Sequence, residues 1–215
     1  MTSSAPRPDA VRIAVFAKAP VPGAVKTRLA ALLGAEGAAA LHAGLVRRAL
    51  MAAVRSGVAA VELWCAPDES HAFFAECARE FGVVLRRQVG ADLGARMEHA
   101  ANETLAAGFA SLIIGTDCPA LEAAALREAA LELGRHDAVL KPAEDGGYVL
   151  IGLSRAIPGV FESIEWGGAN VAADTRARLA GAGASWKELA ASWDIDRPED
   201  YTRAQAEGLL ERGPC

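Results

Sequence analysis

Four short segments of this sequence combine charged residues and glycines in ways that suit chemistry. The first, residues 17–29, contains Lys18, Lys26 and Arg28 around Gly23, three cations within eleven residues. At the start of a helix, free backbone N–H groups and the close approach that Gly23 allows would form a site for an anion such as phosphate. The alternative is a helix start with solvated basic side chains, although cations are unfavourable at that end of the helix dipole. The distance from Gly23 to Lys26 does not fit a Walker A motif.

Two further segments offer carboxylates for a hard divalent cation. Asp117 follows a fully apolar run, and Asp196 precedes a helix that Pro198 would begin. Mg²⁺ or Mn²⁺ keeps several waters and bridges substrate phosphates, so one or two such carboxylates suffice. The structural alternatives are that Asp117 caps a helix and that Asp196 marks a helix start.

The remaining segment is a glycine-rich turn at residues 142–148. Asp145, Gly146 and Gly147 precede Tyr148 and an apolar run. Two glycines allow backbone amides to approach a ligand closely. The same Asp-Gly pair is also a common hairpin turn, and both interpretations stay open.

Several well-known arrangements are absent from the sequence. It contains no G-x-S-x-G, no H-E-x-x-H, and no G-x-G-x-x-G near the first predicted strand. Each histidine is expected on a surface or helix face rather than as a ligand, and three aromatic residues are expected in the core. The histidines are His42, His71, His99 and His136, and the aromatic residues are Trp64, Trp186 and Phe73.

The elements that must position these segments follow from composition and periodicity. The chain has 215 residues, 52% hydrophobic content and a net charge of −5, which predict one globular domain over residues 11–210 after a disordered leader at 1–10. The acidic balance argues against a nucleic-acid partner. A cytoplasmic protein is predicted by the four scattered cysteines and the lack of a signal peptide. No apolar run is long enough to cross a bilayer, so no membrane span is expected. Alanine-rich helix faces leave room for a homodimer.

Short apolar runs alternate with longer helical patterns. Several strands lack a polar face, so helices should cover both sides of the sheet. This predicts an α/β, three-layer sandwich with a mostly parallel, Rossmann-like sheet, whose strand ends bring the four segments together. The predicted strands are 11–17, 58–65, 83–89, 111–115, 137–141 and 148–153. The predicted helices are 25–56 (two helices broken near Gly34, ended by Gly57), 68–81 (capped by Asp68), 94–108, 119–133, 170–182 and 198–210.

Five segments, taken in order, resemble a family of small bacterial transferases. They are FAKAPVPGAVKTRLA (16–30), GADLGARM (90–97), IIGTDCPAL (113–121), PAEDGGYVLIGL (142–153) and DIDRPEDY (194–201). The family is the glycosyltransferase-A-like group of radical-SAM/selenodomain-associated transferases. It belongs to the nucleotide-diphospho-sugar transferase superfamily and is distantly similar to molybdenum cofactor and phospholactate guanylyltransferases.

The resemblance implies roles for the residues in these segments. Residues 17–28 would hold the nucleotide, with Lys26 and Arg28 on its phosphates, and the catalytic residues would be Asp117 and Lys26. Asp117 and Asp196 would hold Mg²⁺ or Mn²⁺. The full nucleotide-binding set is Ala17, Lys18, Gly23, Lys26, Arg28, Gly94 and Arg96, and the substrate-binding set is Asp145, Gly146, Gly147, Tyr148 and Trp166.

The function implied is a metal-dependent transferase that uses a nucleotide-activated donor and a small-molecule acceptor. Glycosyl transfer from a nucleoside diphosphate sugar is favoured. The alternative is nucleotidyl transfer, in which a nucleoside triphosphate reacts with a phosphorylated acceptor and pyrophosphate is released. A second alternative is a non-catalytic nucleotide-binding domain, because Thr-Asp-Cys holds one carboxylate where a D-x-D motif holds two.

Overall fold

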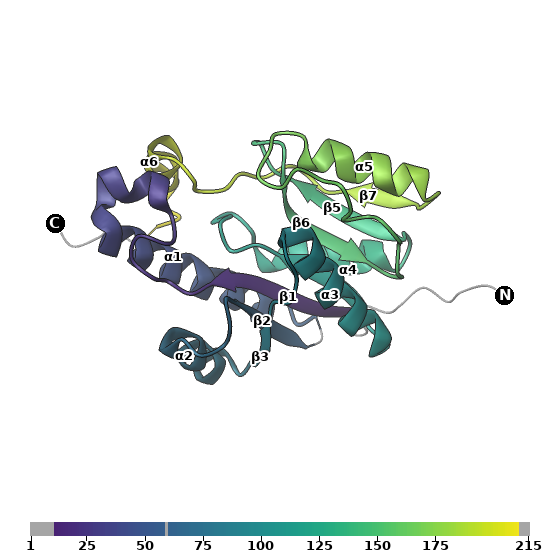
Figure 1. Cartoon of the computed structure of the whole chain (residues 1–215), viewed down its shortest axis with the longest axis horizontal. Helices are drawn as coiled ribbons and strands as arrows, with labels where there is room; N and C mark the ends of the chain where they lie inside the picture. Colours follow the sequence, from purple (N-terminus) through teal and green to yellow (C-terminus); the bar gives the residue numbers. More distant parts are fainter. Residues whose placement is uncertain (1–10, 59, 211–215) are drawn as a thin grey trace.

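The computed structural model describes residues 11–58 and 60–210 and joins every strand of this part of the chain in one sheet (Figure 1). The strand order is β3-β2-β1-β4-β6-β5-β7, and β6 is antiparallel to both of its neighbours while the other pairs are parallel. The predicted α/β, mostly parallel sheet is therefore confirmed, while the predicted leader at 1–10 lies outside the described residues. The strands are β1 (Val11–Lys18), β2 (Val61–Ala66), β3 (Val84–Arg87), β4 (Ala110–Ile114), β5 (Ala138–Pro142), β6 (Tyr148–Leu153) and β7 (Trp186–Glu188).

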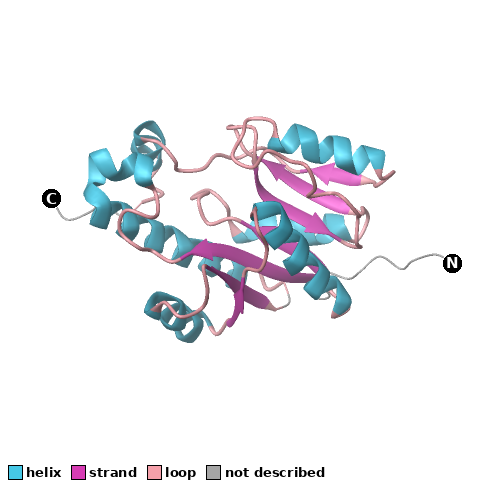
Figure 2. Ribbon diagram, viewed as in Figure 1, coloured by secondary structure: helices cyan, strands magenta, loops and turns pink. Residues whose placement is uncertain are grey.

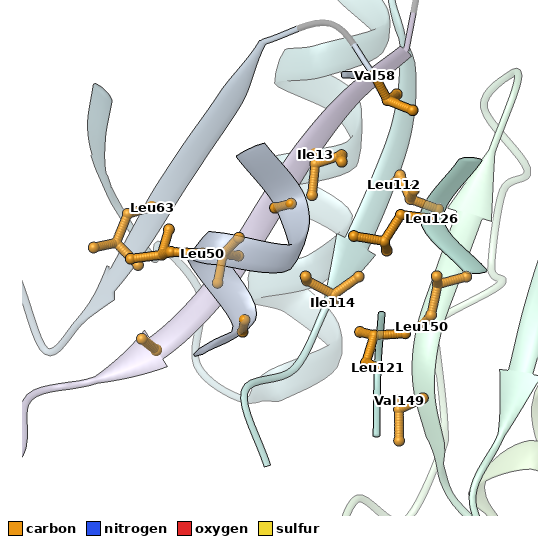
Figure 3. Close-up of a cluster of buried hydrophobic side chains, with 14 of the residues drawn as sticks. Ile13, Leu50, Val58, Leu63, Leu112, Ile114, Leu121, Leu126, Val149 and Leu150 are labelled. Atoms are coloured by element: carbon orange, nitrogen blue, oxygen red, sulfur yellow. The ribbon is translucent and has the colours of Figure 1, made fainter. Parts of the chain in front are cut away.

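Helices cover both faces of the sheet, as the apolar strands require (Figure 2). One core cluster joins the sheet to α1, α2 and α4, and a second joins the opposite face to α3 and α5. Successive residues of a strand alternate between the two cores, so Ile114 lies in the first and Ile113 in the second. Figure 3 shows part of the first cluster. The helices are η2 (Thr27–Leu29), α1 (Ala30–Arg55), α2 (Ala72–Phe81), α3 (Leu93–Ala106), α4 (Ala123–Leu133), α5 (Val171–Gly181) and α6 (Pro198–Ala206).

Helix α1 is broken where the sequence predicts a break. Gly34 has φ 72° and ψ 168°, which is non-helical, and Gly57 follows the helix with φ 65°. Segment Thr27–Arg55 is long and apolar enough, by length and composition, to cross a membrane. In this structure, however, Val46, Leu50 and other residues of α1 are buried in the first core.

Two predicted helix starts are wrong, and one strand was not predicted. Helix α2 begins at Ala72 rather than at 68, because the ring of His71 accepts the N–H of Phe73, whereas Asp68 accepts the N–H of Ser70. Helix α4 begins at Ala123 rather than near Pro119, so Asp117 does not cap it. Strand β7 was not predicted.

The last segment of the chain returns across the sheet. After β7, the chain crosses to α6, which lies beside α1 (Figure 1). Trp193 and Ile195 of this crossing are buried in a third core cluster with Leu29 and Leu45. The crossing therefore lies over the strand ends, where the predicted site should be.

Candidate active site

Backbone pairing brings the predicted segments together at one edge of the sheet. The loop after β4 meets the crossing segment where the N–H of Ile195 donates to the carbonyl of Asp117, at 2.9 Å. The turn after β5 meets the same segment where the N–H of Ser192 donates to the carbonyl of Pro142, also at 2.9 Å. Because β6 is antiparallel, its first residue, Tyr148, also lies at this edge.

Lys26 lies at the centre of this edge. Its ammonium is 2.8 Å from Oδ1 of Asp117 and donates to the carbonyl of Ile195 at 2.5 Å. The Lys26 side chain is only 4% exposed, against 47% for that of Asp117. The backbone of Lys26 is left-handed, with φ 47°, which costs an L-residue roughly 1 kcal/mol. A buried cation held in a strained backbone conformation is typical of functional sites.

The two other basic residues of the first segment are more exposed. The Arg28 guanidinium forms an ion pair with the carboxylate of Asp196. Lys18 is exposed at the end of β1, and Gly23 is exposed in the loop with φ 79°. The carbonyl of Ala17, at the end of β1, accepts an N–H from the Gln88 amide at 3.3 Å. The three cations therefore share one loop, but only Lys26 is buried.

Asp194 is the carboxylate that the sequence interpretation missed. It lines a pocket of about 220 Å³ together with Asp117 and Asp145. Burial, and then the negative charges of Asp145 and Asp117, raise the pKa of Asp194 to about 6. The acidic residues on either side of buried Ile195 were the signal that could have pointed to Asp194 as well as to Asp196.

His42 lies on a helix face, one of the two predicted positions, but it is on the buried face of α1. Its Nε2 is 3.0 Å from the carbonyl of Lys18, and its Nδ1 is 3.9 Å from Oδ1 of Asp117. Burial lowers the pKa of His42, while the charge of Asp117 opposes this shift. His42 therefore connects the end of β1 to the loop after β4.

Four of the five predicted substrate-binding residues line the pocket, namely Asp145, Gly147, Tyr148 and Trp166, whereas Gly146 does not. Asp145 accepts the N–H of Gly147 at 2.9 Å, which forms the hairpin turn between β5 and β6. The ring of Tyr148 meets Trp166 edge to face, with 6.4 Å between the ring centroids. Burial raises the pKa of the Tyr148 hydroxyl. Gly146 (φ 93°) is needed in the turn because a Cβ there would lie 1.9 Å from the carbonyl oxygen of Ala169.

The start of α3 supports the same wall. A Cβ at Gly94 would lie 2.7 Å from Nε1 of Trp166, so glycine allows this indole to pack against the helix. Asp92 caps α3 by accepting the N–H of Ala95. Arg96 donates to the carbonyl of Gly90 at 3.2 Å.

The carboxylates of this edge suit a divalent cation that keeps other ligands. The described residues contain no group of three or more His, Cys, Asp or Glu side chains that could hold a metal ion. Asp117 and Asp194 supply carboxylate oxygens at one pocket, which is the donor type that Mg²⁺ and Mn²⁺ prefer. The donor set therefore fits an ion that takes its remaining ligands from water and substrate phosphates.

Fold and site together define the class. The chain has the fold of the nucleotide-diphospho-sugar transferases, with charged residues gathered at the carboxyl ends of its strands. It is similar to a structure from Desulfovibrio desulfuricans G20 that is provisionally assigned as a nucleotide-diphospho-sugar transferase. The two are 30% identical, with a TM-score of 0.81, over 88% of this chain and 83% of that chain. The chain belongs to the family described as "Uncharacterized protein conserved in bacteria (DUF2064)", whose model matches residues 49–168.

More distant structures share the fold. A nucleotidyl transferase from Methanothermobacter is 18% identical over 93% of this chain and 98% of that chain, with a TM-score of 0.61. Rv0371c from Mycobacterium tuberculosis H37Rv, solved in complex with manganese, is 16% identical over 90% and 97% of the two chains, with a TM-score of 0.52. No curated protein matches the sequence significantly.

Proposed function

We propose that this protein is a metal-dependent transferase that uses a nucleotide-activated donor. The observation that carries the proposal is the position of Asp117, which faces the buried ammonium of Lys26 at 2.8 Å and also lines the acidic pocket. Asp117 would therefore join the basic loop that would bind the donor to the pocket that would bind the acceptor. The Desulfovibrio structure, at 30% identity, supports a nucleotide-diphospho-sugar donor.

The residues of the first loop would bind the donor. Lys26, which contacts Asp117 after β4, and Arg28, which pairs with Asp196, would neutralise the phosphates of a nucleotide. Lys18, Gly23 and the end of β1 at Ala17 would border the nucleotide. Gly94 and Arg96 at the start of α3, next to the pocket wall that Trp166 forms, would also contact the nucleotide. Charged groups held in place before the reaction lower the barrier because they need no reorganisation as charge develops.

Asp117 would hold Mg²⁺ or Mn²⁺, with Asp194 as its partner in the pocket. When bound, such an ion neutralises the charge that develops on the leaving phosphate. Asp196, the second carboxylate predicted from the sequence, would lie beside this pair, where it orients Arg28. The manganese complex of Rv0371c supports a divalent ion in this fold. The same proposal includes membership of the radical-SAM/selenodomain-associated transferases. It also includes a cytoplasmic location and a single domain over residues 11–210.

Binding of the donor can be tested by thermal shift with nucleotides and nucleotide sugars, with and without Mn²⁺. A ligand present at ~100 times its dissociation constant stabilises the folded state by ~2.7 kcal/mol. We expect this stabilisation to require Mn²⁺ and to be lost in Asp117→Asn. The matched control is Asp174→Asn, which removes a carboxylate from the first turn of α5. Stabilisation that is equal with and without Mn²⁺ would instead support the non-catalytic nucleotide-binding domain.

The products distinguish the two transferase reactions. Glycosyl transfer releases a nucleoside diphosphate, whereas nucleotidyl transfer releases pyrophosphate from a nucleoside triphosphate. Nucleotidyl transfer is kept as the second candidate because the Methanothermobacter nucleotidyl transferase has the same fold.

A further inference from the structure

The pocket beside Asp117 is lined by aromatic rings and carboxylates. Aromatic rings enter it from three separate parts of the chain, namely Phe16 on β1, Tyr148 on β6 and Trp166 before α5. Its charged lining residues are Asp117, Asp145 and Asp194. None of the described residues that line it is a lysine, an arginine or a histidine. The pocket is thus both aromatic and acidic.

The nearest cation offsets only part of this acidic character. The ammonium of Lys26 is engaged by Asp117 and by the carbonyl of Ile195, and its side chain is 4% exposed. Arg28 is held by Asp196, outside the pocket lining. Lys26 therefore offsets the charge of Asp117 from the loop side, while none of the described residues that line the pocket is itself basic.

We propose that this pocket accepts a neutral or cationic group and excludes phosphorylated and carboxylated ones. A phosphate placed there would lie among three carboxylates, whereas aromatic faces favour both the apolar face of a hydroxylated ring and a cation. A divalent ion on Asp117 and Asp194 would attract the donor phosphates, so within the loaded pocket the selection against a further phosphate would rest on Asp145 at the turn.

This inference rests on the proposed function and makes it more specific. A nucleotidyl transferase of the type described above requires a phosphorylated acceptor, which this pocket would repel. A glycosyl transferase requires room for a sugar or a hydroxylated acceptor, which carries no charge. The pocket therefore favours glycosyl transfer to a phosphate-free acceptor.

Trp166 offers a direct measurement of the charge in the pocket. Its fluorescence in the full chain is obtained as the difference between wild type and Trp166→Phe, and quenching is measured with caesium and with iodide at constant ionic strength. Each value is divided by quenching with neutral acrylamide, which removes the effect of exposure, and by the same ion's quenching of free N-acetyltryptophanamide, which removes the different intrinsic efficiencies of the two ions. We expect caesium to quench Trp166 at least about threefold more efficiently than iodide, because the acidic groups concentrate cations.

Two variants isolate the cause. Asp145→Asn should reduce the preference for caesium by roughly half, since it removes one pocket carboxylate and keeps the side-chain oxygen that Gly147 binds. Glu144→Gln is the matched control, because this adjacent exposed carboxylate pairs with Arg203 and does not line the pocket. Equal quenching by the two ions, or an effect of Glu144→Gln as large as that of Asp145→Asn, would overturn the proposal.

Two small molecules with the same ring and opposite charge test the ligand class. Glucosamine should protect Trp166 from acrylamide at a concentration at least about tenfold lower than glucose 6-phosphate does. Protection by glucose 6-phosphate that equals or exceeds that of glucosamine overturns the inference. Because no nucleotide is present, this result is independent of the donor experiment. If the protein binds the donor but iodide quenches Trp166 better than caesium does, the proposed function stands and only this inference is overturned.

Discussion

The contact between Lys26 and Asp117 can be tested by replacing the lysine with methionine, which keeps the length and removes the charge. In Lys26→Met, Asp117 loses its cation and the carbonyl of Ile195 loses a donor. Breaking a fully buried ion pair costs about 3–5 kcal/mol, and an exposed pair contributes about 1 kcal/mol or less. Because Lys26 is buried while Asp117 is half exposed, we expect a loss of about 2 kcal/mol.

Thermal unfolding in the presence of EDTA measures this loss. For a chain of this size, 1 kcal/mol shifts the Tm by roughly 2–4 °C, so Lys26→Met should melt about 4–8 °C below wild type. Mn²⁺ should restore more stability to the variant than to wild type, since a divalent ion can replace the lost positive charge beside Asp117. The control is Lys187→Met, which removes an exposed lysine on β7.

Two results would refute this reasoning. If Lys26→Met and Lys187→Met melt within about 1 °C of each other in EDTA, the 2.8 Å contact contributes nothing to stability. If the variant is destabilised but Mn²⁺ acts equally on both proteins, Asp117 does not bind the ion, and the proposed metal site is wrong.

Two further predictions concern Asp194 and the turn at Gly146. Asp194→Asn should abolish stabilisation by Mn²⁺. In the absence of the ion, urea titration should show that the variant is more stable than wild type at pH 7 by about 1 kcal/mol, after allowance for solvent screening. The sign follows because a carboxyl whose pKa is raised in the folded protein costs stability as the pH rises from about 4 through 6. The stability gained in Asp194→Asn should therefore vanish at pH 4. A gain that persists at pH 4 contradicts this explanation. Gly146→Ala should cost about 2 kcal/mol or more, because its Cβ would collide with Ala169 at a positive φ. The control Gly44→Ala, in a helix interior with open space, should gain up to about 1 kcal/mol, and equal effects of the two changes would refute the collision.

Local backbone chemistry explains why much of the fold could be predicted from sequence. The break at Gly34 and the end at Gly57 are glycines with positive φ, a conformation that other residues avoid. The apolar run of β4 has no polar face, so two covering layers follow from it directly. Strand β7 was missed because three residues with two charges carry no strand pattern, and parallel pairing with β5 forms it.

The site was only partly predictable for a similar reason. The sequence places both Asp194 and Asp196 before α6, but only the folded chain shows that Arg28 engages Asp196 while Asp194 enters the pocket. His42 had a detectable signal, since Ala38, His42, Leu45 and Ala49 form one buried stripe at helical spacing. What the stripe could not show is that its polar member reaches the carbonyl of Lys18 and lies near Asp117.

The arrangement of charge matters more here than its total. The chain is acidic overall, yet Lys18, Lys26 and Arg28 form a cationic loop on one side of Asp117, and the acidic pocket lies on the other. In the proposed function, the phosphates of a donor belong on the loop side and a phosphate-free group belongs in the pocket. The bond that breaks in the transfer must then lie next to Asp117, because among the described residues only this carboxylate both pairs with Lys26 and lines the pocket. Loss of Lys26 should therefore impair the donor side first and loss of Asp145 the pocket side first, whereas loss of Asp117 should impair both.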